Sequence, residues 1–403
     1  MIKRDSYIEK IRGFMDKPEL VKIITGIRRS GKSVMLELIR DELRFLGVPE
    51  SNMLVYNFED MELEPLKDAG SLHKHIKKKI NALSGRVYLF FDELQEVERW
   101  EKCVNSLRVD SDADIYITGS NAKMLKGDYA TLLAGRYIEI RMYPFSFSEY
   151  CAAERENGQT ESEAEAFKHY VKRGGMPVLS NLGLNDVDAK QYLKDIYASV
   201  VIKDIMTQNS FRDVDLLERI IFYVLANIGK TFSATSISKF FKSENRVVAP
   251  ETVLNYLKGC EDAFLFERLK YLDVPSKRIL QVNEKYYIAD HGMREAVFGN
   301  NERDIELVLE NIVCMELLRR GYEVSVGRAA GKEIDFIAAR GEERVYIQVC
   351  YLLASDDTIE REFGALYKIY DNYPKYVLSL DEFDLSREGI RHENVRNFLQ
   401  DIR

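Results

Sequence analysis

The sequence predicts an α/β protein whose N-terminal part is built on a parallel sheet, and three observations support this fold class. Short apolar runs such as "ELVKIITG", "MLVYNFED" and "ADIYITGSN" are typical of buried strands and are separated by segments of helical periodicity. The first run leads into the loop "GIRRSGKS" at Gly26–Ser33, which is followed by a helical segment. A further run, "RVYLFFDELQEV", ends in the two acidic residues Asp92 and Glu93.

The composition predicts a globular protein of more than one domain. With 403 residues, the chain exceeds the size of an ordinary single core. Its net charge of -8 argues against a strongly basic nucleic-acid binder, although a local basic patch remains compatible with it. The five cysteines lack the CxxC spacing of zinc sites, and no apolar run is long enough for a membrane span or resembles a signal peptide. We therefore expect reduced thiols, a cytoplasmic location and no membrane association.

The loop Gly26–Ser33 matches the phosphate-binding pattern G-x-x-x-x-G-K-[ST] in the strand–loop–helix context that the pattern requires. The two glycines let the loop curl so that its N–H groups point inward, and the helix N-terminus adds positive partial charge. We expect Lys32 to reach the β- and γ-phosphates of a nucleotide and Ser33 to hold Mg²⁺. A chance match is the alternative. The expected nucleotide-binding residues are Gly26, Ile27, Arg28, Arg29, Ser30, Gly31, Lys32, Ser33 and Val34.

Polar side chains at two other strand ends are candidate catalytic residues. We expect Asp92 to support Mg²⁺ through water and Glu93 to act as the base for the attacking water, with an acidic helix start as the alternative interpretation. Ser120 and Asn121 follow a fourth strand. Asn121 would sense the γ-phosphate or place the water, or else these residues simply cap the next helix, which "AKMLKGDYATLLAG" predicts.

These motifs, together with "LLAGRY", "PFSFSEY", "RGGMP" and "VIKDI", make almost the whole chain resemble AAA+-like P-loop ATPases of bacteria and archaea that carry a C-terminal domain of unknown function. The resemblance implies ATP rather than a guanine nucleotide, with Mg²⁺ as its metal. It also implies an arginine finger at Arg136, which would act across a subunit boundary in a homo-oligomer. A surface or lid salt bridge is the alternative role for Arg136.

The patterns and the resemblance predict four consecutive parts. They are an ATPase core over 1–150, a helical lid over 151–212, a winged helix-turn-helix over 213–300 and a restriction-endonuclease-like α/β domain over 301–403.

The winged helix is expected because three helical segments precede two paired strands. Arg246 and the pair Lys277 and Arg278 would support contacts with a DNA backbone, so both DNA contact and a protein-docking or structural role remain open. The exposed positions of its third helix are a poor set for reading bases: Glu251, Asn255, Lys258 and Glu261.

The C-terminal helix–strand–hairpin order resembles the PD-(D/E)xK nuclease fold. Glu310 matches the helix glutamate and Asp335 the strand aspartate, but Gln348 and Cys350 stand where the E-x-K pair is expected. A cutting nuclease needs clustered carboxylates for Mg²⁺ and a lysine near the attacking water. The sequence therefore predicts a degenerate site on a scaffold kept for binding or packing.

The sequence as a whole predicts an ATP-binding and ATP-hydrolysing protein that couples its nucleotide state to binding or remodelling of duplex DNA or a protein partner. A slow, nucleotide-gated docking module without significant turnover is the first alternative. An ATP-gated nuclease is the second alternative, and the missing carboxylate and lysine argue against it.

Overall fold

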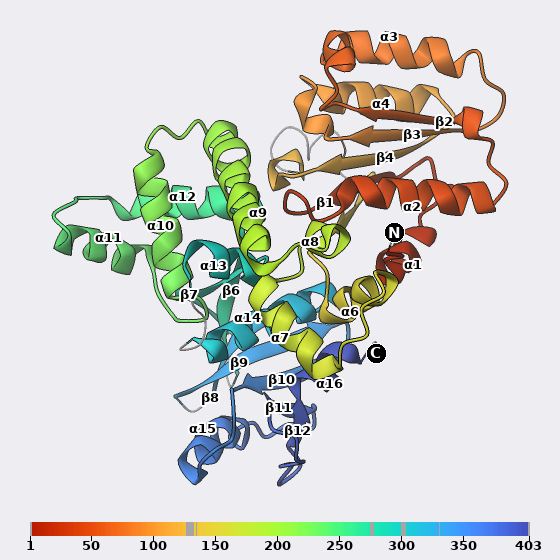
Figure 1. Cartoon of the computed structure of the whole chain (residues 1–403). Helices are drawn as coiled ribbons and strands as arrows, with labels where there is room; N and C mark the ends of the chain where they lie inside the picture. Colours follow the sequence, from red (N-terminus) through yellow and green to blue (C-terminus); the bar gives the residue numbers. More distant parts are fainter. Residues whose placement is uncertain are drawn as a thin grey trace. The chain divides into compact units, whose positions relative to one another are not determined.

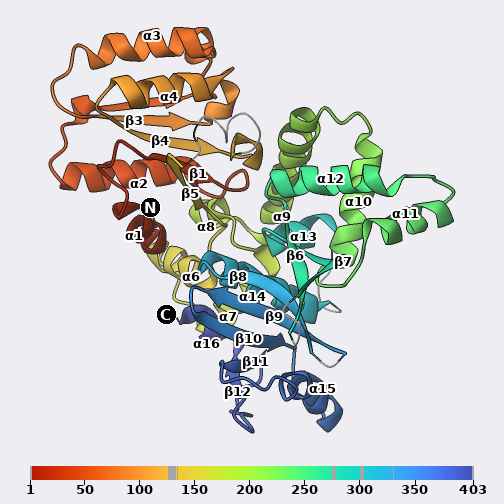
Figure 2. The same cartoon turned by 180° about the vertical axis from the view of Figure 1, so that it is seen from behind.

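The computed structural model describes residues 2–125, 133, 135–274, 278–299, 304–329 and 331–401, with the backbone alone for 278–283. The chain forms two compact units (Figures 1 and 2). Unit 1 comprises Met1–Met142 with Asp262–Phe264, and unit 2 comprises Tyr143–Glu261 with Leu265–Arg403. None of the described helices is long and apolar enough to cross a membrane.

Unit 1 contains a five-stranded parallel sheet with the strand order β2-β3-β4-β1-β5. The strands are β1 (Val21–Thr25), β2 (Met53–Asn57), β3 (Val87–Asp92), β4 (Ala113–Gly119) and β5 (Tyr137–Arg141). Helices α3 and α4 cover one face of the sheet, and α1 and α2 cover the other (Figure 1). These helices are α1 (Asp5–Arg12), α2 (Lys32–Phe45), α3 (Ala69–Ile80) and α4 (Trp100–Asp110). Short helical turns lie in the connections at η1 (Glu50–Asn52), η2 (Met61–Leu66), η3 (Leu94–Glu96) and η4 (Ala122–Leu125).

Buried side chains alternate between the two faces of this sheet. Leu89 and Phe91 pack in the cluster under α3 and α4, whereas Tyr88 and Phe90 pack in the cluster under α1 and α2. A strand of a parallel sheet is covered on both faces, which explains why β3 is continuously apolar. The strands and the helix predicted for the N-terminal part are confirmed. Most of the helix predicted from "AKMLKGDYATLLAG" lies outside the described residues.

Unit 2 combines a group of helices with a seven-stranded mixed sheet of order β12-β11-β10-β9-β8-β6-β7. The strands are β6 (Phe266–Asp273), β7 (Arg278–Ile288), β8 (Glu323–Ala329), β9 (Lys332–Arg340), β10 (Glu343–Val349), β11 (Lys375–Ser379) and β12 (Arg391–Asn394). Helices that precede the first strand are α6 (Phe147–Glu156), α7 (Glu163–Arg173), α8 (Pro177–Leu182), α9 (Asp186–Ser199), the π-helical η5 (Val200–Thr207), α10 (Val214–Ala226), α11 (Ala234–Ser243) and α12 (Pro250–Asp262). The later helices are α13 (His291–Val297), α14 (Ile305–Arg319), α15 (Asp356–Leu366) and α16 (Val395–Gln400).

Three helices followed by a hairpin occur in the predicted order in α10, α11, α12, β6 and β7. A capping box formed by Ser233 and Ser236 begins α11, and Pro250 begins α12. The hairpin does not stand apart, because β6 also pairs in parallel with β8. One sheet therefore continues from the hairpin into the C-terminal strands, and the proposed boundary near residue 300 stays a prediction.

The glycine pair of the "RGGMP" motif has a packing role in unit 2. A Cβ atom at Gly175 would lie 2.2 Å from the carbonyl oxygen of Phe145, and one at Gly174 would lie 2.3 Å from Oδ1 of Asp290. The Gly175 N–H donates to Oδ2 of Asp290 at 2.7 Å. Burial raises the pKa of Asp290, although the neighbouring His291 acts in the opposite direction. The two glycines thus allow the chain after α7 to approach the start of α13.

Candidate functional site

The loop between β1 and α2 lies at the carboxyl ends of the parallel strands of unit 1. Gly26 has a φ angle of 144°, and a Cβ atom there would lie 2.2 Å from the carbonyl oxygen of Met142. Gly31, at the N-cap of α2, has a φ angle of 98°. A residue with a side chain rarely adopts these angles, so both glycines of the motif are required by the backbone path.

Lys32 begins α2, and its ammonium group lies under the loop. The side chain is buried, and Nζ donates to the carbonyl oxygens of Gly26 and Ile27 at 3.1 and 3.2 Å. The first turn of an α-helix directs backbone N–H groups outward along the axis, where they attract anions. The loop, the helix start and the ammonium therefore form a suitable environment for phosphate groups.

Ser33 and Asp92 come together beside this helix start. The Ser33 hydroxyl and the Thr118 hydroxyl both hydrogen-bond to the Asp92 carboxylate. Burial raises the pKa of Asp92, and the hydrogen bonds from Thr118 and Ser33 partly offset this effect. A hydroxyl and a carboxylate next to a phosphate site are the oxygen ligands that Mg²⁺ prefers. The residues present therefore fit a Mg²⁺ ion bound together with a nucleotide.

Glu93 follows β3 with a φ angle of 51°, a left-handed conformation that is uncommon for a side chain of this kind. Its N–H donates to Oγ1 of Thr118 at 2.9 Å. Its Oε1 lies 3.8 Å from Nζ of Lys32, while Gln95 donates a hydrogen bond to Oε2. The turn therefore directs this buried carboxylate toward the ammonium of Lys32.

Asn121 is buried just after β4 at the same edge of the sheet. Its Oδ1 accepts a hydrogen bond from the backbone N–H of Lys123 at 2.9 Å, at the start of η4. Asn121 therefore caps the following helical turn, as the alternative to a catalytic role predicted. The role in sensing the γ-phosphate stays a prediction.

Arg136 lies at the amino-terminal end of β5, whereas the loop lies at the carboxyl-terminal ends of the strands. Arg136 precedes β5, its carbonyl oxygen accepts from the N–H of Val21 at 2.9 Å, and its side chain is exposed. Val21 begins β1, whereas the loop follows the end of this strand. A strand of this length spans roughly 15 Å at about 3.3 Å per residue, so Arg136 does not reach the loop of its own chain.

Three residues of this site were not predicted. Arg4 is buried, donates from Nη1 to the carbonyl oxygen of Ser30 at 3.1 Å and stacks over Tyr7. Only the fold brings this N-terminal residue to the loop, and no sequence signal marks it. The sequence does carry signals for the other two residues. Thr118 is a polar residue within an apolar strand, and Gln95 lies two positions after the expected base.

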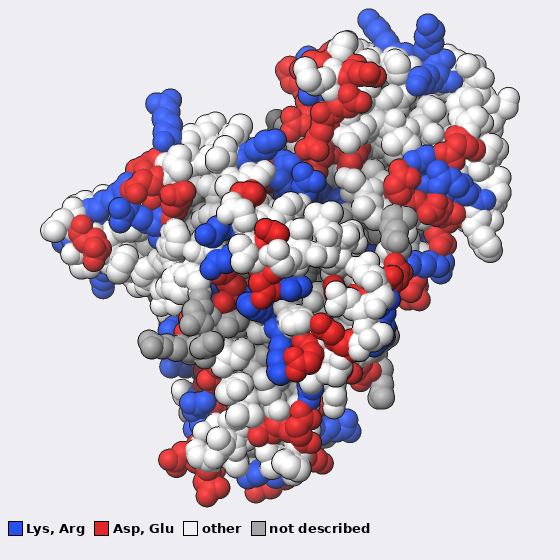
Figure 3. All heavy atoms as spheres, in the orientation of Figure 1, with Lys and Arg blue, Asp and Glu red and all other residues white. Residues whose placement is uncertain are grey.

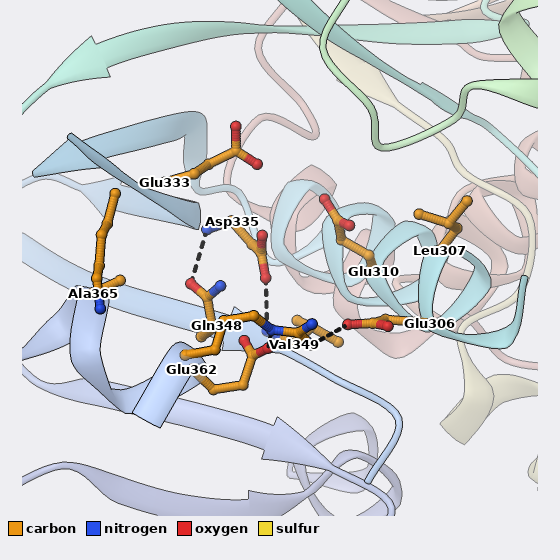
Figure 4. Close-up of a pocket in the computed structure, with 11 residues that line it drawn as sticks. Glu306, Leu307, Glu310, Glu333, Asp335, Gln348, Val349, Glu362 and Ala365 are labelled. Atoms are coloured by element: carbon orange, nitrogen blue, oxygen red, sulfur yellow. Dashed lines mark hydrogen bonds and ion pairs between the residues drawn. The ribbon is translucent and has the colours of Figure 1, made fainter. Parts of the chain in front are cut away.

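A second group of predicted residues meets in a cavity of unit 2 with a volume of about 340 Å³ (Figure 4). Glu310 from α14, Asp335 from β9 and Gln348 from β10 line it. The Asp335 N–H donates to Oε1 of Gln348 at 3.2 Å, and Oδ2 of Asp335 accepts from the N–H of Val349 at 2.8 Å. Cys350 instead packs in a hydrophobic cluster, where burial raises the pKa of its thiol.

The positive charge of this carboxylate group comes from Lys285 on β7, which was not predicted. Its Nζ lies 2.9 Å from Oε1 of Glu310, 2.8 Å from Oε1 of Glu333 and 3.8 Å from Oδ1 of Asp335. Burial lowers the pKa of Lys285, but the neighbouring carboxylates outweigh burial and raise it overall. Within the described residues, no group of three or more His, Cys, Asp or Glu side chains is arranged to hold a metal ion. The lysine ammonium is the counter-charge of this cluster.

Comparisons with known proteins agree with the geometry of unit 1. Residues 18–151 match an AAA domain, and residues 164–304 match a domain of unknown function (DUF8612). The match to an AAA domain confirms the predicted class of the N-terminal part.

Two relatives match nearly the whole chain. An uncharacterised protein from Haemophilus influenzae is 38% identical over 380 residues, which cover 94% of this chain and 93% of the relative. An uncharacterised protein from Methanocaldococcus jannaschii is 30% identical over 416 residues, with 98% and 87% of the two chains covered. Among solved structures, the Walker-type ATPase of Pyrococcus abyssi has a TM-score of 0.51 and 16% identity, over 73% of this chain and 95% of that one. This last likeness shows a shared fold.

Proposed function

Because the chain belongs to the family of these uncharacterised Haemophilus influenzae and Methanocaldococcus jannaschii proteins and carries an AAA domain, we propose that it binds ATP with Mg²⁺ and hydrolyses ATP to ADP and phosphate. One observation carries the proposal. Lys32 and Ser33 from α2 meet Asp92 and Glu93 from the end of β3, with a Ser33–Asp92 hydrogen bond and a 3.8 Å Lys32–Glu93 contact. Phosphate, metal and an attacking water need these side-chain types in one place.

Each side chain has a distinct role in this proposal. Lys32 exchanges its carbonyl acceptors for oxygens of the β- and γ-phosphates. Ser33 and Asp92 hold Mg²⁺, which neutralises charge on the phosphates when it is bound. Glu93 accepts a proton from the attacking water, and Gln95 orients the Glu93 carboxylate through its hydrogen bond. Asn121 contributes by placing the water or sensing the γ-phosphate.

Arg136 serves a neighbouring copy in this proposal. It lies at the opposite end of the strands from the loop of its own chain and its side chain is exposed, which suits a residue that reaches into a second subunit. An arginine in that position stabilises charge on the transferring phosphoryl group. The active assembly is therefore a homo-oligomer with sites shared between copies.

Mixing two inactive variants tests this shared site. Lys32→Met lacks the phosphate-binding ammonium but keeps the arginine, and Arg136→Ala has the reverse defect. If Arg136 acts in trans, the mixture regains ATP hydrolysis at interfaces where an intact loop meets an intact arginine. A mixture as inactive as its components would show that Arg136 does not act in this way.

We favour a protein over duplex DNA as the partner of the α10–α12 helices. Arg246 forms ion pairs with Asp213 and Asp215, which compete with DNA phosphates for its guanidinium. The exposed positions of α12 include both Glu251 and Lys258. On the face shown in Figure 3, described basic side chains lie among acidic ones without a continuous basic band. Lys277 lies outside the described residues, and only the backbone of Arg278 is described.

The test is steady-state ATP hydrolysis by the wild type and by Glu93→Gln, each with and without duplex DNA. The wild type should turn over ATP, whereas the variant should bind ATP without hydrolysing it. Stimulation by DNA that fades as salt rises would identify DNA as the partner in place of a protein. Tight ATP binding with negligible turnover in both proteins would contradict hydrolysis and favour the docking module.

A further inference from the structure

A groove of about 690 Å³ in unit 2 lies between α7, α9 and α13. Its lining includes apolar side chains that are buried in unit 2 and form a hydrophobic floor: Val171, Ala189, Leu193 and Ala296. Its other lining residues include four with positive charge: Lys168, Lys172, Arg173 and Lys190. A cavity of this size holds a few side chains of a partner.

The positive charge of the groove is only partly neutralised. Lys172 and Arg173 share the single carboxylate of Asp186, with a distance of 2.8 Å from the Arg173 guanidinium to Oδ1. Lys168 pairs with Glu165 at 2.7 Å. Lys190 is exposed and has no ion pair among the described residues. Glu295, the other acidic residue of the lining, pairs with Arg294 at 3.1 Å, so the groove keeps an excess of positive charge above its apolar floor.

An exposed segment of unit 1, Glu59–Glu64, has the complementary properties. Met61 is 85% exposed, which is unusual for a large apolar side chain. Asp60 and Glu62 flank it and form no ion pairs with described residues, whereas the charges of Glu59 and Glu64 are paired. The Asp60 side chain also accepts from the N–H of Glu62 at 2.9 Å, so the start of η2 is held in one conformation. The segment presents an apolar tip between two carboxylates on an ordered turn.

We propose that the groove of one copy docks the segment Glu59–Glu64 of a second copy. Met61 packs on the apolar floor, because a flexible thioether side chain adapts to irregular apolar surfaces. Asp60 faces Lys172, which shares the Asp186 carboxylate with Arg173, and Glu62 faces Lys190, which has no ion pair among the described residues. The two surfaces are different, so each copy offers one of each. Such a head-to-tail contact closes into a ring or extends into a filament.

This docking goes beyond the proposed ATPase and does not require hydrolysis. It would supply the neighbouring copy that Arg136 needs, but the contact rests on charge and apolar complementarity alone. Failure of the docking would leave ATP binding intact, and failure of ATP binding would leave the docking intact. The two proposals are therefore tested by separate measurements on the same proteins.

The experiment is sedimentation velocity of the full chain between about 1 and 100 µM, with and without a non-hydrolysable ATP analogue. The groove variant is Lys190→Glu, and the segment variant is Glu62→Lys, which keeps the Asp60 side chain that holds the start of η2. The wild type should assemble as its concentration rises, and each variant should assemble at least about tenfold more weakly, because like charges would then oppose each other. A mixture of the two variants should assemble again, since each reversed surface meets a reversed partner.

Matched controls separate docking from folding and from net charge. Lys194→Glu changes an exposed lysine of α9 outside the groove, and Glu9→Lys changes an exposed glutamate of α1. Both should assemble as the wild type does, and every variant should retain binding of the ATP analogue. A wild type that stays monomeric throughout would overturn the proposal, as would a variant that assembles normally. A mixture of the groove and segment variants that stays monomeric would also overturn the proposal. That result is expected if the groove binds a segment of its own chain or another protein instead of a second copy.

Discussion

The ammonium of Lys32 and the carboxylate of Glu93 face each other at the candidate nucleotide site, with 3.8 Å between Nζ and Oε1. Both side chains are buried, so each compensates a charge that would otherwise be costly to remove from water. Lys32 comes from the start of α2, whereas Glu93 comes from the turn after β3. Lys32 and Glu93, the expected phosphate-binding group and the proposed base, are therefore brought together by two separate elements of the fold.

Lys32→Met should weaken ATP binding by roughly tenfold to a hundredfold, because hydrogen bonds to charged groups contribute about 1.5–3 kcal/mol. The variant also leaves the buried Glu93 carboxylate without its nearby positive charge. Isothermal titration calorimetry with ATP and Mg²⁺ measures the loss of affinity, and circular dichroism confirms that the variant folds.

Glu93→Gln is the matched control, since it removes the partner charge but keeps the ammonium. It should retain ATP affinity within a few-fold of the wild type while it loses turnover. Wild-type affinity in Lys32→Met would show that the loop binds phosphate without this side chain, or does not bind phosphate.

Gly26→Ala should weaken ATP binding and lower the free energy of unfolding. A Cβ atom there would lie 2.2 Å from the carbonyl oxygen of Met142, in a backbone conformation that alanine rarely adopts. Conformational strain of this kind costs about 1–3 kcal/mol, and the steric clash adds to it. Urea unfolding measures the stability, and calorimetry measures the ATP affinity.

Gly47→Ala separates the effect of backbone strain from the effect of the steric clash. Gly47 also has a positive φ angle, 87°, but a Cβ atom there meets nothing within 4 Å. This control should lose stability modestly and bind ATP normally. Equal effects of the two substitutions on ATP affinity would mean that the close approach to Met142 does not matter.

The arrangement of the N-terminal candidate site was predictable because its residues lie in short, contiguous motifs. The glycine pattern fixes the loop, and the acidic pair follows an apolar strand, so parallel strands bring Lys32 and Glu93 to one edge of the sheet. The sequence could not reveal Arg4, which reaches Ser30 only through the packing of α1. Nor does the motif show that Asn121 caps η4, because capping and catalysis favour the same side chain at that position.

The C-terminal cluster was predictable only in part. Glu310, Asp335 and Gln348 meet as their pattern predicts, but their positive partner comes from β7, outside that pattern. In the sequence, Lys285 is a charged residue within a predicted strand, and nothing in the residues around it indicates that its side chain is buried. Its place follows from the pairing of β6 with β8, which joins two predicted domains in one sheet.

His392 should make the stability of the protein depend on pH. Its Nδ1 accepts from the N–H of Leu385, and its Nε2 hydrogen-bonds to Ser379, whose hydroxyl donates to Asp381. Burial lowers the pKa of His392, although the charges of Asp381 and Asp384 oppose this effect. The unfolded chain therefore takes up a proton near pH 6.5, whereas the folded chain does so only at lower pH.

The free energy of unfolding should consequently fall as pH drops below about 6.5. Urea unfolding between about pH 8 and 5 should show a steeper loss for the wild type than for His392→Gln, which cannot titrate at this position. His169→Gln, at a more exposed histidine, should follow the wild type. Parallel pH profiles for the wild type and His392→Gln would rule out this linkage.

Lys285→Met should be strongly destabilising at neutral pH. The substitution removes the ammonium that lies within 2.9 Å of Glu310 and Glu333, and it leaves their carboxylates without a counter-charge. Removing one partner from a buried ion pair costs about 3–5 kcal/mol. Urea unfolding should show this loss, whereas Lys332→Met, which removes an exposed lysine at the same cavity, should have little effect.

The loss of stability caused by Lys285→Met should be smaller at acidic pH. It should also be smaller when a second substitution removes one of the unpaired carboxylates. Burial raises the pKa of Asp335, and the nearby Glu310 charge adds to this effect, so protonation relieves the repulsion as pH falls. The double variant Lys285→Met/Glu310→Gln should recover part of the lost stability at pH 7, because it removes one unpaired charge. If Lys285→Met were as stable as the wild type at neutral pH, the carboxylates would not depend on this lysine. The cluster would then lack the counter-charge role assigned to it, and its carboxylates would have to be neutral in the folded protein.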